Sequence, residues 1–269
     1  MKALEIEGVA RAGRGGIAAG LLVVLLVGCG ASEPEGPGGA ASDPALRLIQ
    51  EARRQLVGQG VPGASGRAPL QAARVHLSAG RLERARELAE PELDGPSSAE
   101  AHYLMGVLEA RALRWARAAE LYEGAFAEGP GYPERVLLPF KYGRALEELG
   151  RVAAARAAYE LDDELSADGE ALFRLGLFDL EAGELEAAEE RLAAARRRFT
   201  VPRDVARVLV AQADLALARE DRAGARRCLE EAVQRAPQRA SLARLARLCR
   251  EDGDVASAAR FEAALTRLP

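Results

Sequence analysis

The chain has 269 residues, of which 49% are hydrophobic, 29% charged and 4% aromatic, and its formal net charge is −4. A core with so few aromatic residues favours closely packed helices over a β-sandwich, which draws on β-branched and aromatic side chains. Because 37 lysines and arginines nearly balance 41 aspartates and glutamates, the chain has no basic field to attract a nucleic acid, and no nucleic-acid partner is expected.

The first 28 residues have the features of an export signal. Three basic side chains precede an apolar run over residues 17–27, which is shorter than the roughly 20 residues that a membrane-spanning helix needs. The run ends in the letters LVGC at residues 26–29, which resemble the lipobox of bacterial lipoproteins. The resemblance implies that residues 1–28 are removed and that Cys29 becomes the lipid-bearing first residue. An ordinary cleaved signal, or an uncleaved anchor with a chance cysteine, is the alternative.

The residue after Cys29 bears on the destination of such a lipoprotein. Several acyl chains on one residue give durable membrane anchoring. In enterobacterial lipoproteins an aspartate at the next position favours retention at the inner membrane, and this chain has Gly30 there. The resemblance therefore implies a lipid-anchored protein of the bacterial cell envelope, at the outer membrane and facing the periplasm.

Two segments separate this N-terminus from the main domain. Residues 29–43 are rich in Gly, Pro and Ser, which predicts a flexible tether. Residues 44–65 are predicted to form a helix from Pro44 to Val57, capped by Ser42 or Asp43, and then a Gly-rich linker. The helix either caps the following domain or is half of a decayed repeat. The linker matches G-x-G-x-x-G at 58–63, but a dinucleotide site needs a strand before that motif, and here a helix precedes it.

From residue 66 to 269 the chain repeats a pattern of two amphipathic helices. A small residue recurs near the start of each second helix, at spacings that alternate between 33 and 37 residues: Ala85, Ala118, Ala155, Ala188, Ala225 and Ala258. Small residues recur likewise on the first helices: Ala73, Gly106, Gly143, Gly176, Ala213 and Ala246. These positions resemble the tetratricopeptide repeat. The resemblance implies an all-α fold, a right-handed α-solenoid of about six helical hairpins.

The turns within and between hairpins show two irregularities. In four repeats the turn between the two helices, called the corner here, has a glycine, at residues 80, 150, 183 and 253. A residue in the left-handed conformation commonly ends a helix at such a position. Leu113 and Glu220 replace glycine in repeats two and five, which predicts a different turn there. The alternating spacing predicts longer loops around residues 131–134 and 200–204.

The resemblance also implies a groove for a partner protein, lined by the first helix of each repeat. Carried over residue by residue, the exposed positions and their polar rim are Arg74, Tyr103, Val107, Arg111, Phe140, Arg144, Glu147, Phe173, Leu177 and Asp214. Tyr103, Phe140 and Phe173 share one repeat position in a chain with few aromatic residues. Exposed aromatic residues next to arginines anchor partners well. The same three rings could instead fill the core against the preceding repeat, and the sequence does not decide between these roles.

No constellation of residues predicts catalysis. The two histidines, His76 and His102, lie 26 residues apart with no cysteine or carboxylate at ligand spacing, so no metal site is expected. No nucleophilic triad, phosphate loop or carboxylate pair stands out, and neither a cofactor nor a small-molecule substrate is expected. Cys228 and Cys249 lie on neighbouring predicted helices, where they are either buried apolar residues or a disulfide.

These features together predict a non-catalytic, membrane-anchored scaffold or adaptor for assembly of an envelope complex. Six repeats behind a lipobox resemble the pilotin-type lipoproteins that help type IV pilus secretins assemble, and the lipoprotein subunits of the β-barrel assembly machinery. The alternative is a regulator of an envelope enzyme such as a peptidoglycan hydrolase or synthase. In either case the expected partner is another envelope protein, whose identity the sequence does not give.

Overall fold

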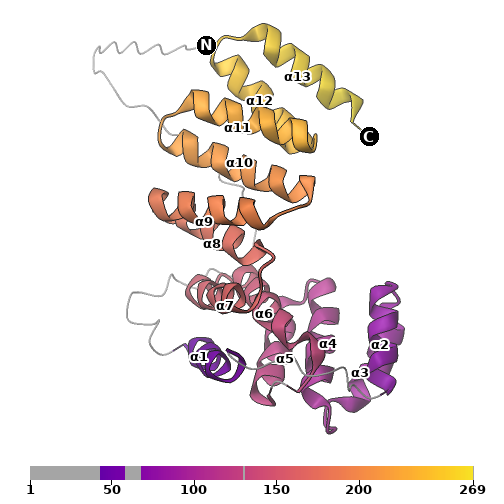
Figure 1. The fold of residues 1–269 in the computed structure, drawn as a ribbon. Coiled ribbons are helices and arrows are strands. Elements are labelled where there is room, and N and C mark those ends of the chain that lie inside the picture. Colours follow the sequence, from indigo (N-terminus) through magenta and orange to yellow (C-terminus); the bar gives the residue numbers. More distant parts are fainter. Residues whose placement is uncertain (1–42, 58–67, 130, 269) are drawn as a thin grey trace, which may run out of the picture. The chain divides into compact units, whose positions relative to one another are not determined.

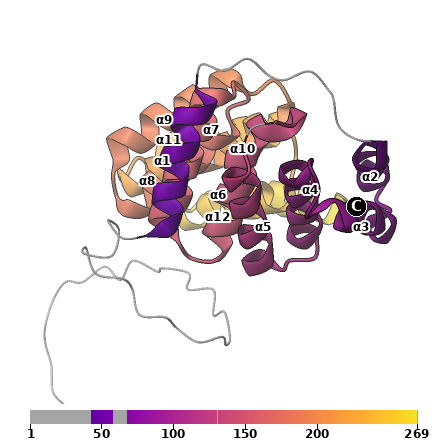
Figure 2. The ribbon, with the colours of Figure 1, turned by 90° about the horizontal axis from the view of Figure 1, so that it is seen from below.

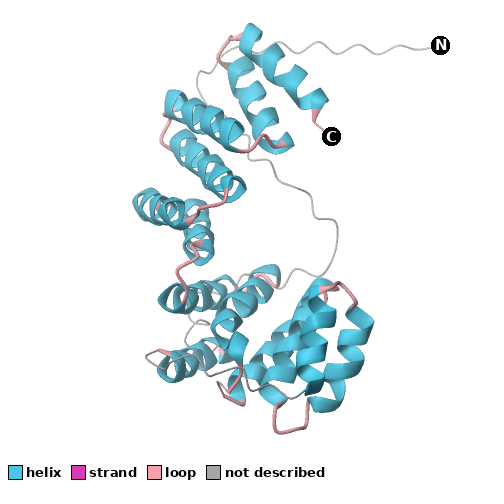
Figure 3. Ribbon diagram, turned by 45° about the vertical axis from the view of Figure 1, so that its right-hand side comes forward, coloured by secondary structure: helices cyan, strands magenta, loops and turns pink. Residues whose placement is uncertain are grey.

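The computed structural model describes residues 43–57, 68–129 and 131–268. Its contacts divide the chain after Gly36, and all described residues belong to the second part, Pro37–Pro269. Within the described ranges every regular element is a helix (Figure 3). The predicted signal peptide, Cys29, the tether up to residue 42 and the Gly-rich linker lie outside these ranges. None of the described helices combines the length and the apolar character that crossing a membrane requires.

Twelve of the helices form six hairpins in chain order, as the repeat pattern predicts (Figure 1). In each hairpin the two helices pack against each other, and each second helix contacts the first helix of the next hairpin. The first helices are α2 (Ala68–Ser78), α4 (Ser98–Arg111), α6 (Leu138–Glu148), α8 (Glu170–Ala182), α10 (Pro202–Ala218) and α12 (Arg239–Glu251). Their partners are α3 (Leu82–Ala89), α5 (Trp115–Ala127), α7 (Val152–Leu165), α9 (Leu185–Arg198), α11 (Arg222–Arg235) and α13 (Val255–Arg267).

Small residues let the two helices of a hairpin approach closely. All six alanines near the start of the second helices are at most 2% exposed. On α4, a Cβ added at Gly106 would lie 2.5 Å from the ring of Tyr122 on α5. Gly143 faces Tyr159 and Gly176 faces Leu192 in the same way, with the added Cβ 2.9 Å away in both. The repeated glycine of the first helix therefore makes room for the large residue of the second.

All six corners have the same backbone geometry, and the prediction of different turns at Leu113 and Glu220 is wrong. Leu113 has φ 59° and Glu220 has φ 62°, close to the 73° of Gly150. The same pair of backbone hydrogen bonds closes each corner. In repeat two, the N–H of Arg114 donates to the carbonyl of Glu109 at 2.9 Å and that of Leu113 to Ala110 at 3.0 Å. Packing of the hairpin thus imposes the left-handed residue even where glycine is missing.

The two four-residue insertions are accommodated differently. After α5, the extra residues include the 3₁₀ helix η3 (Pro133–Leu137), where a loop was predicted. After α9, only residues 199–201 connect to α10, which begins at Pro202 and has 17 residues. The second insertion therefore lengthens a helix, and the predicted loop around residues 200–204 is wrong. A further 3₁₀ helix, η2 (Glu90–Glu92), follows α3.

Helix α1 (Pro44–Leu56) lies apart from the hairpin that follows it in sequence. Asp43 is its N-cap and accepts a hydrogen bond from the N–H of Ala45 at 2.9 Å, as predicted. Its buried stripe is Ala45, Ile49, Ala52 and Leu56. The stripe packs against α7 and α5, the second helices of repeats three and two (Figures 1 and 2). The helix is therefore neither a cap at the start of the array nor half of a repeat.

Candidate functional site

An open groove of about 520 Å³ lies in the described part of the chain. It runs along four consecutive first helices, α4, α6, α8 and α10, and reaches the start of α5. The residues that line it are Val107, Ala110, Arg111, Trp115, Tyr122, Phe140, Lys141, Arg144, Glu170, Arg174 and Arg207. The repeat places these side chains in one row because the first helices stack with the same face turned to the same side.

One part of the groove is apolar. Val107, Trp115 and Phe140 are all partly buried and pack against the main hydrophobic cluster of the array. The ring of Phe140 lies 5.6 Å from that of Tyr159, which fixes its orientation. These side chains expose apolar surface beside polar groups, a combination typical of sites that bind another molecule.

The other part is strongly basic, with five cationic side chains and one carboxylate, Glu170. Arg207 donates to Glu170 at 2.8 and 3.0 Å, and Arg174 donates to Glu147 at 3.2 Å. Arg144 pairs with Glu148, four residues further along α6, at 2.9 Å. The hydrogen bonds to Glu170 raise the pKa of Arg207 above its ordinary value, so the guanidinium is charged at any physiological pH. The pairs of Arg207 with Glu170 and of Arg174 with Glu147 connect successive repeats, whereas the pair of Arg144 with Glu148 lies within α6.

Four of the ten residues predicted for the groove line it: Val107, Arg111, Phe140 and Arg144. Two of the three aromatic residues at the shared position take the alternative role in the core. Tyr103 is 4% exposed and packs against Tyr122 and Tyr132, with ring centroids 6.3 and 5.6 Å away. Phe173 is 6% exposed beneath Arg207, whose guanidinium lies 4.6 Å from the ring centroid. Of the three rings, only Phe140 lines the groove.

The remaining predicted residues lie between repeats. Arg74 pairs with Glu100 at 2.5 Å and with Glu134 at 2.8 Å, which ties α2 to α4 and η3. Asp214 pairs with Arg244 of α12 at 2.8 Å. Leu177 packs against the cluster around Leu172 and Phe173. Glu147 supports the groove by accepting from Arg174.

Sequence reasoning missed seven of the lining residues, above all Lys141, Arg174 and Arg207. Lys141 and Arg174 directly follow Phe140 and Phe173, so both cations occupy one repeat position, and this recurrence could have revealed them. Arg207 stands at the position of Glu170 in the next repeat, 37 residues on. That pair faces each other only because the hairpins stack, so no local pattern indicates it.

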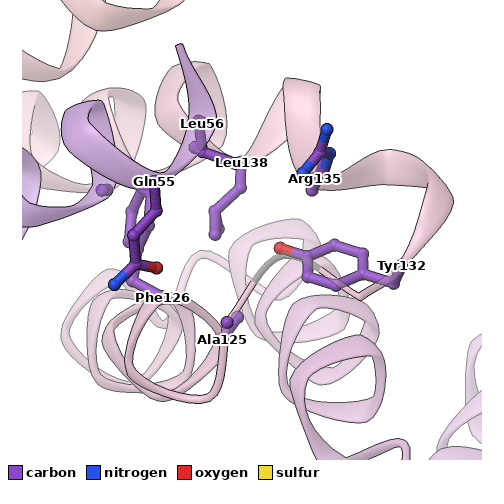
Figure 4. Close-up of a pocket in the computed structure, with 9 residues that line it drawn as sticks. Gln55, Leu56, Ala125, Phe126, Tyr132, Arg135 and Leu138 are labelled. Atoms are coloured by element: carbon purple, nitrogen blue, oxygen red, sulfur yellow. The ribbon is translucent and has the colours of Figure 1, made fainter. Parts of the chain in front are cut away.

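A second cavity lies beside α1 and is much smaller, with room for about one water molecule at roughly 10 Å³. Figure 4 shows Gln55 and Leu56 of α1 on one side of it and Tyr132 on the other. Burial raises the pKa of Tyr132 far above its usual range, so this hydroxyl stays protonated. The cavity is a packing gap between α1 and the array.

The described residues also bear on metal binding and on the possible disulfide. Among them no group of three or more His, Cys, Asp or Glu side chains could hold a metal ion. Cys228 and Cys249 are free thiols, and both pack into the cluster of the last two hairpins. Burial raises the pKa of both thiols, which lowers their reactivity as thiolates. In this structure Cys249 is a small buried residue and Cys228 a partly buried one.

The geometry defines the class of protein: an all-helical repeat array whose first helices form a groove. Residues 67–133 and 210–269 match the model of the tetratricopeptide repeat. These matched segments and the six paired hairpins show the fold of a tetratricopeptide-repeat array. Tetratricopeptide repeats are typically non-catalytic scaffolds that bind peptides and proteins. No curated protein sequence matches the chain.

Solved structures of other repeat proteins have the same fold. PilF of Pseudomonas aeruginosa is 24% identical, with a TM-score of 0.61 over 81% of this chain and 92% of that one. PilW, described as a widely conserved type IV pilus biogenesis factor, is 17% identical, with a TM-score of 0.61 over 73% and 90%. YrrB, described as a TPR protein with an unusual peptide-binding site, is 21% identical, with a TM-score of 0.54 over 74% and 95%. At these identities the likeness concerns the fold alone.

Proposed function

We propose that this chain is a non-catalytic scaffold that binds a segment of another protein in the groove of α4, α6, α8 and α10. The observation that carries the proposal is the groove itself, which is large enough for several side chains and combines Val107, Trp115 and Phe140 with fixed charged groups. The peptide-binding site named for YrrB, a protein of the same fold, supports this class of ligand. In this proposal the chain needs neither a metal nor a cofactor.

A photo-crosslinking residue at position 107 tests the groove directly. Val107 lines the groove, whereas the side chain of Arg227 on α11 is 72% exposed and lies outside it. A partner should be captured from position 107 and not from position 227. The captured protein, once purified, should bind the wild-type chain and compete with crosslinking at position 107. Equal capture from both positions, or no competition, would contradict the groove.

We also propose that the scaffold is anchored by lipid at Cys29 to the bacterial cell envelope, facing the periplasm at the outer membrane. The support is the sequence of residues 17–30, with its apolar run, lipobox-like end and Gly30. Cys29→Ser should abolish labelling by radioactive palmitate and leave the chain at precursor length on a gel. Labelled mutant protein, or a mature chain that begins elsewhere, would overturn the anchor.

The partner is then a protein of an envelope assembly. PilW is described as a pilus biogenesis factor, and its fold, like that of PilF, supports testing pilus components first. The identity of the crosslinked protein separates the alternatives: a pilus secretin or barrel-assembly subunit supports the adaptor, and a peptidoglycan hydrolase or synthase supports a regulator.

A further inference from the structure

Two cations of the groove form no ion pair with any residue of the described part of the chain. Arg144, Arg174 and Arg207 each pair with a carboxylate. Among the described residues, Arg111 donates only to a neutral group, the carbonyl of Leu77, at 2.8 Å. Lys141 makes no ion pair with any residue that the structure describes. The groove therefore contains two positive charges that the array itself does not neutralise.

Lys141 is partly buried, so the lack of an ion-pair partner among the described residues makes its charge energetically unfavourable. Its side chain is partly buried, and burial lowers the pKa of its ammonium, with Arg111 and Arg144 lowering it further. Asp162, a buried carboxyl on α7, acts weakly in the opposite direction. A partly buried charge without a counter-ion costs free energy, which an anion placed beside it would recover. The groove is thus electrostatically incomplete in the free chain.

The surroundings of these cations select the kind of anion. Val107, Trp115 and Phe140 offer apolar contacts next to Arg111 and Lys141, which suits a chain that carries both apolar and acidic side chains. A nucleic acid fits poorly, because Glu147, Glu148 and Glu170 flank the same groove and the whole chain has a net charge of −4. A nucleic acid carries a negative charge at every nucleotide, so it would also place charges beside those carboxylates. A short protein segment can carry an acidic side chain only where it meets Arg111 and Lys141.

We propose that the groove binds an extended protein segment that places an aspartate or glutamate between Arg111 and Lys141 and an apolar side chain against Val107, Trp115 and Phe140. This inference rests on the function proposed above and names the chemistry of the partner. The carboxylate is held by charge-assisted hydrogen bonds, which are stronger than neutral ones. The apolar contact adds buried area and fixes the register of the segment.

To test this proposal, peptides that bind the full-length chain are selected from a library of random 12-residue peptides. Selected peptides should carry acidic residues next to apolar ones. Trp115 is the only tryptophan of the chain and lines the groove, so its fluorescence measures each dissociation constant without a label. Replacing the acidic residues of a selected peptide by Asn or Gln should weaken its binding at least about tenfold, because a charge-assisted contact is lost.

Variants of the two free cations locate the effect. Lys141→Gln and Arg111→Gln should each weaken the acidic peptide about tenfold and leave its amide analogue unchanged. Arg84→Gln on α3, where the arginine is exposed and outside the groove, serves as the matched control and should bind like wild type. Lys141→Gln loses no ion pair with a described residue, only the contact of the ammonium with the Phe140 ring, 5.9 Å from its centroid. It should therefore melt close to wild type, which separates a binding defect from unfolding.

The outcomes separate this inference from the groove function. If neutral apolar peptides are selected and bind the variants as well as wild type, the groove binds peptides but the acidic partner is wrong. If no peptide is selected above background, both proposals fail. If a 12-nucleotide oligothymidine displaces the acidic peptides with higher affinity, the ligand is a nucleic acid and the acidic segment is again wrong.

Discussion

At the scale of single residues, the fold depends on which positions are small. The glycines of the first helices are helical and gain nothing from conformational freedom, since glycine disfavours a helix by about 1 kcal/mol relative to alanine. Their role is steric, because each faces a large side chain of its partner helix. Sequence spacing alone identified these positions, since an α-helical period fixes which side chains share a face.

Gly106→Ala tests this steric role. The new Cβ would lie 2.5 Å from Cε1 of Tyr122, whose ring is fully buried and cannot move freely. We expect a loss of about 1–3 kcal/mol in the free energy of unfolding, which chemical denaturation measures. Gly131→Ala, where an added Cβ meets nothing within 4 Å, is the control and should change little. A stabilised Gly106→Ala would show that helix propensity outweighs the contact.

Asp162 makes stability depend on pH. Burial raises its pKa to about 7, and the carboxylates of Asp168 and Asp163 raise it as well. A hydrogen bond with the backbone of Phe140 and the charge of Lys141 lower the pKa by a smaller amount. The unfolded chain releases this proton near pH 4 and the folded chain only near pH 7. The unfolded state therefore binds fewer protons in this window, and stability falls as the pH rises through it.

Asp162→Asn isolates this contribution. Wild type should lose on the order of 2–4 kcal/mol between pH 4 and pH 8 through this group, and the variant should lack that loss. Denaturant unfolding at several pH values measures the difference between the two proteins. Parallel curves for wild type and variant would mean that Asp162 titrates alike in both states.

At the scale of elements, the corners show tertiary packing overriding local preference. A left-handed conformation costs a non-glycine residue roughly 1–2 kcal/mol. Leu113 and Glu220 adopt it because both flanking helices are fixed by their contacts with the rest of the array. Sequence could not predict this outcome, since locally the two residues argue against the turn that the hairpin requires.

Leu113→Gly should therefore stabilise the chain. The side chain of Leu113 is 70% exposed, so little buried area is lost, and relief of the left-handed strain should add about 0.5–1 kcal/mol. Gly150→Ala is the reverse change at an equivalent corner, where an added Cβ meets no neighbour, and it should lower the melting temperature. Equal melting temperatures for all three proteins would contradict the strain.

Helix α1 is held by one apolar stripe and by two ion pairs, Arg53 with Glu164 at 2.9 Å and Arg151 with Asp43. Ile49 is 2% exposed at the centre of that stripe. Ile49→Asp should release α1 from α5 and α7, because it places a charge in an apolar contact. Hydrogen exchange should then show lost protection over residues 44–56 while the hairpins of the last three repeats keep theirs.

Gln50→Asp provides the matched control, because Gln50 is exposed on the same helix. It introduces the same charge without entering the contact and should leave protection of α1 unchanged. Loss of protection in both variants would mean that helix propensity, and not docking, keeps α1 in place.

At the scale of the whole molecule, each repeat is held mainly by its contacts with the repeats before and after it. One hydrophobic cluster extends from α1 to α8, and further clusters join α8 to α10 and α10 to α13. Ion pairs such as Arg207 with Glu170 also cross from one repeat to the next. The groove arises at this scale, because its lining residues come from four successive hairpins.

The sequence by itself determined the number of hairpins, the helices within them and the small residues at their contacts. These features follow from helical periodicity and from short connections, which are local properties of the chain. It also identified four residues of the groove, because equivalent positions of a repeat share a direction.

Only the tertiary structure decided which rings are buried, where α1 docks and which cations remain unpaired. Tyr103 and Phe140 occupy the same repeat position, yet the ring of Tyr132, just before η3, packs against only the first of them. Helix α1 reaches α7 across about a hundred residues of sequence. The stacking of separate hairpins leaves Lys141 without an ion pair to any residue that the structure describes. Each outcome depends on contacts between distant residues, and a local pattern carries no information about those contacts.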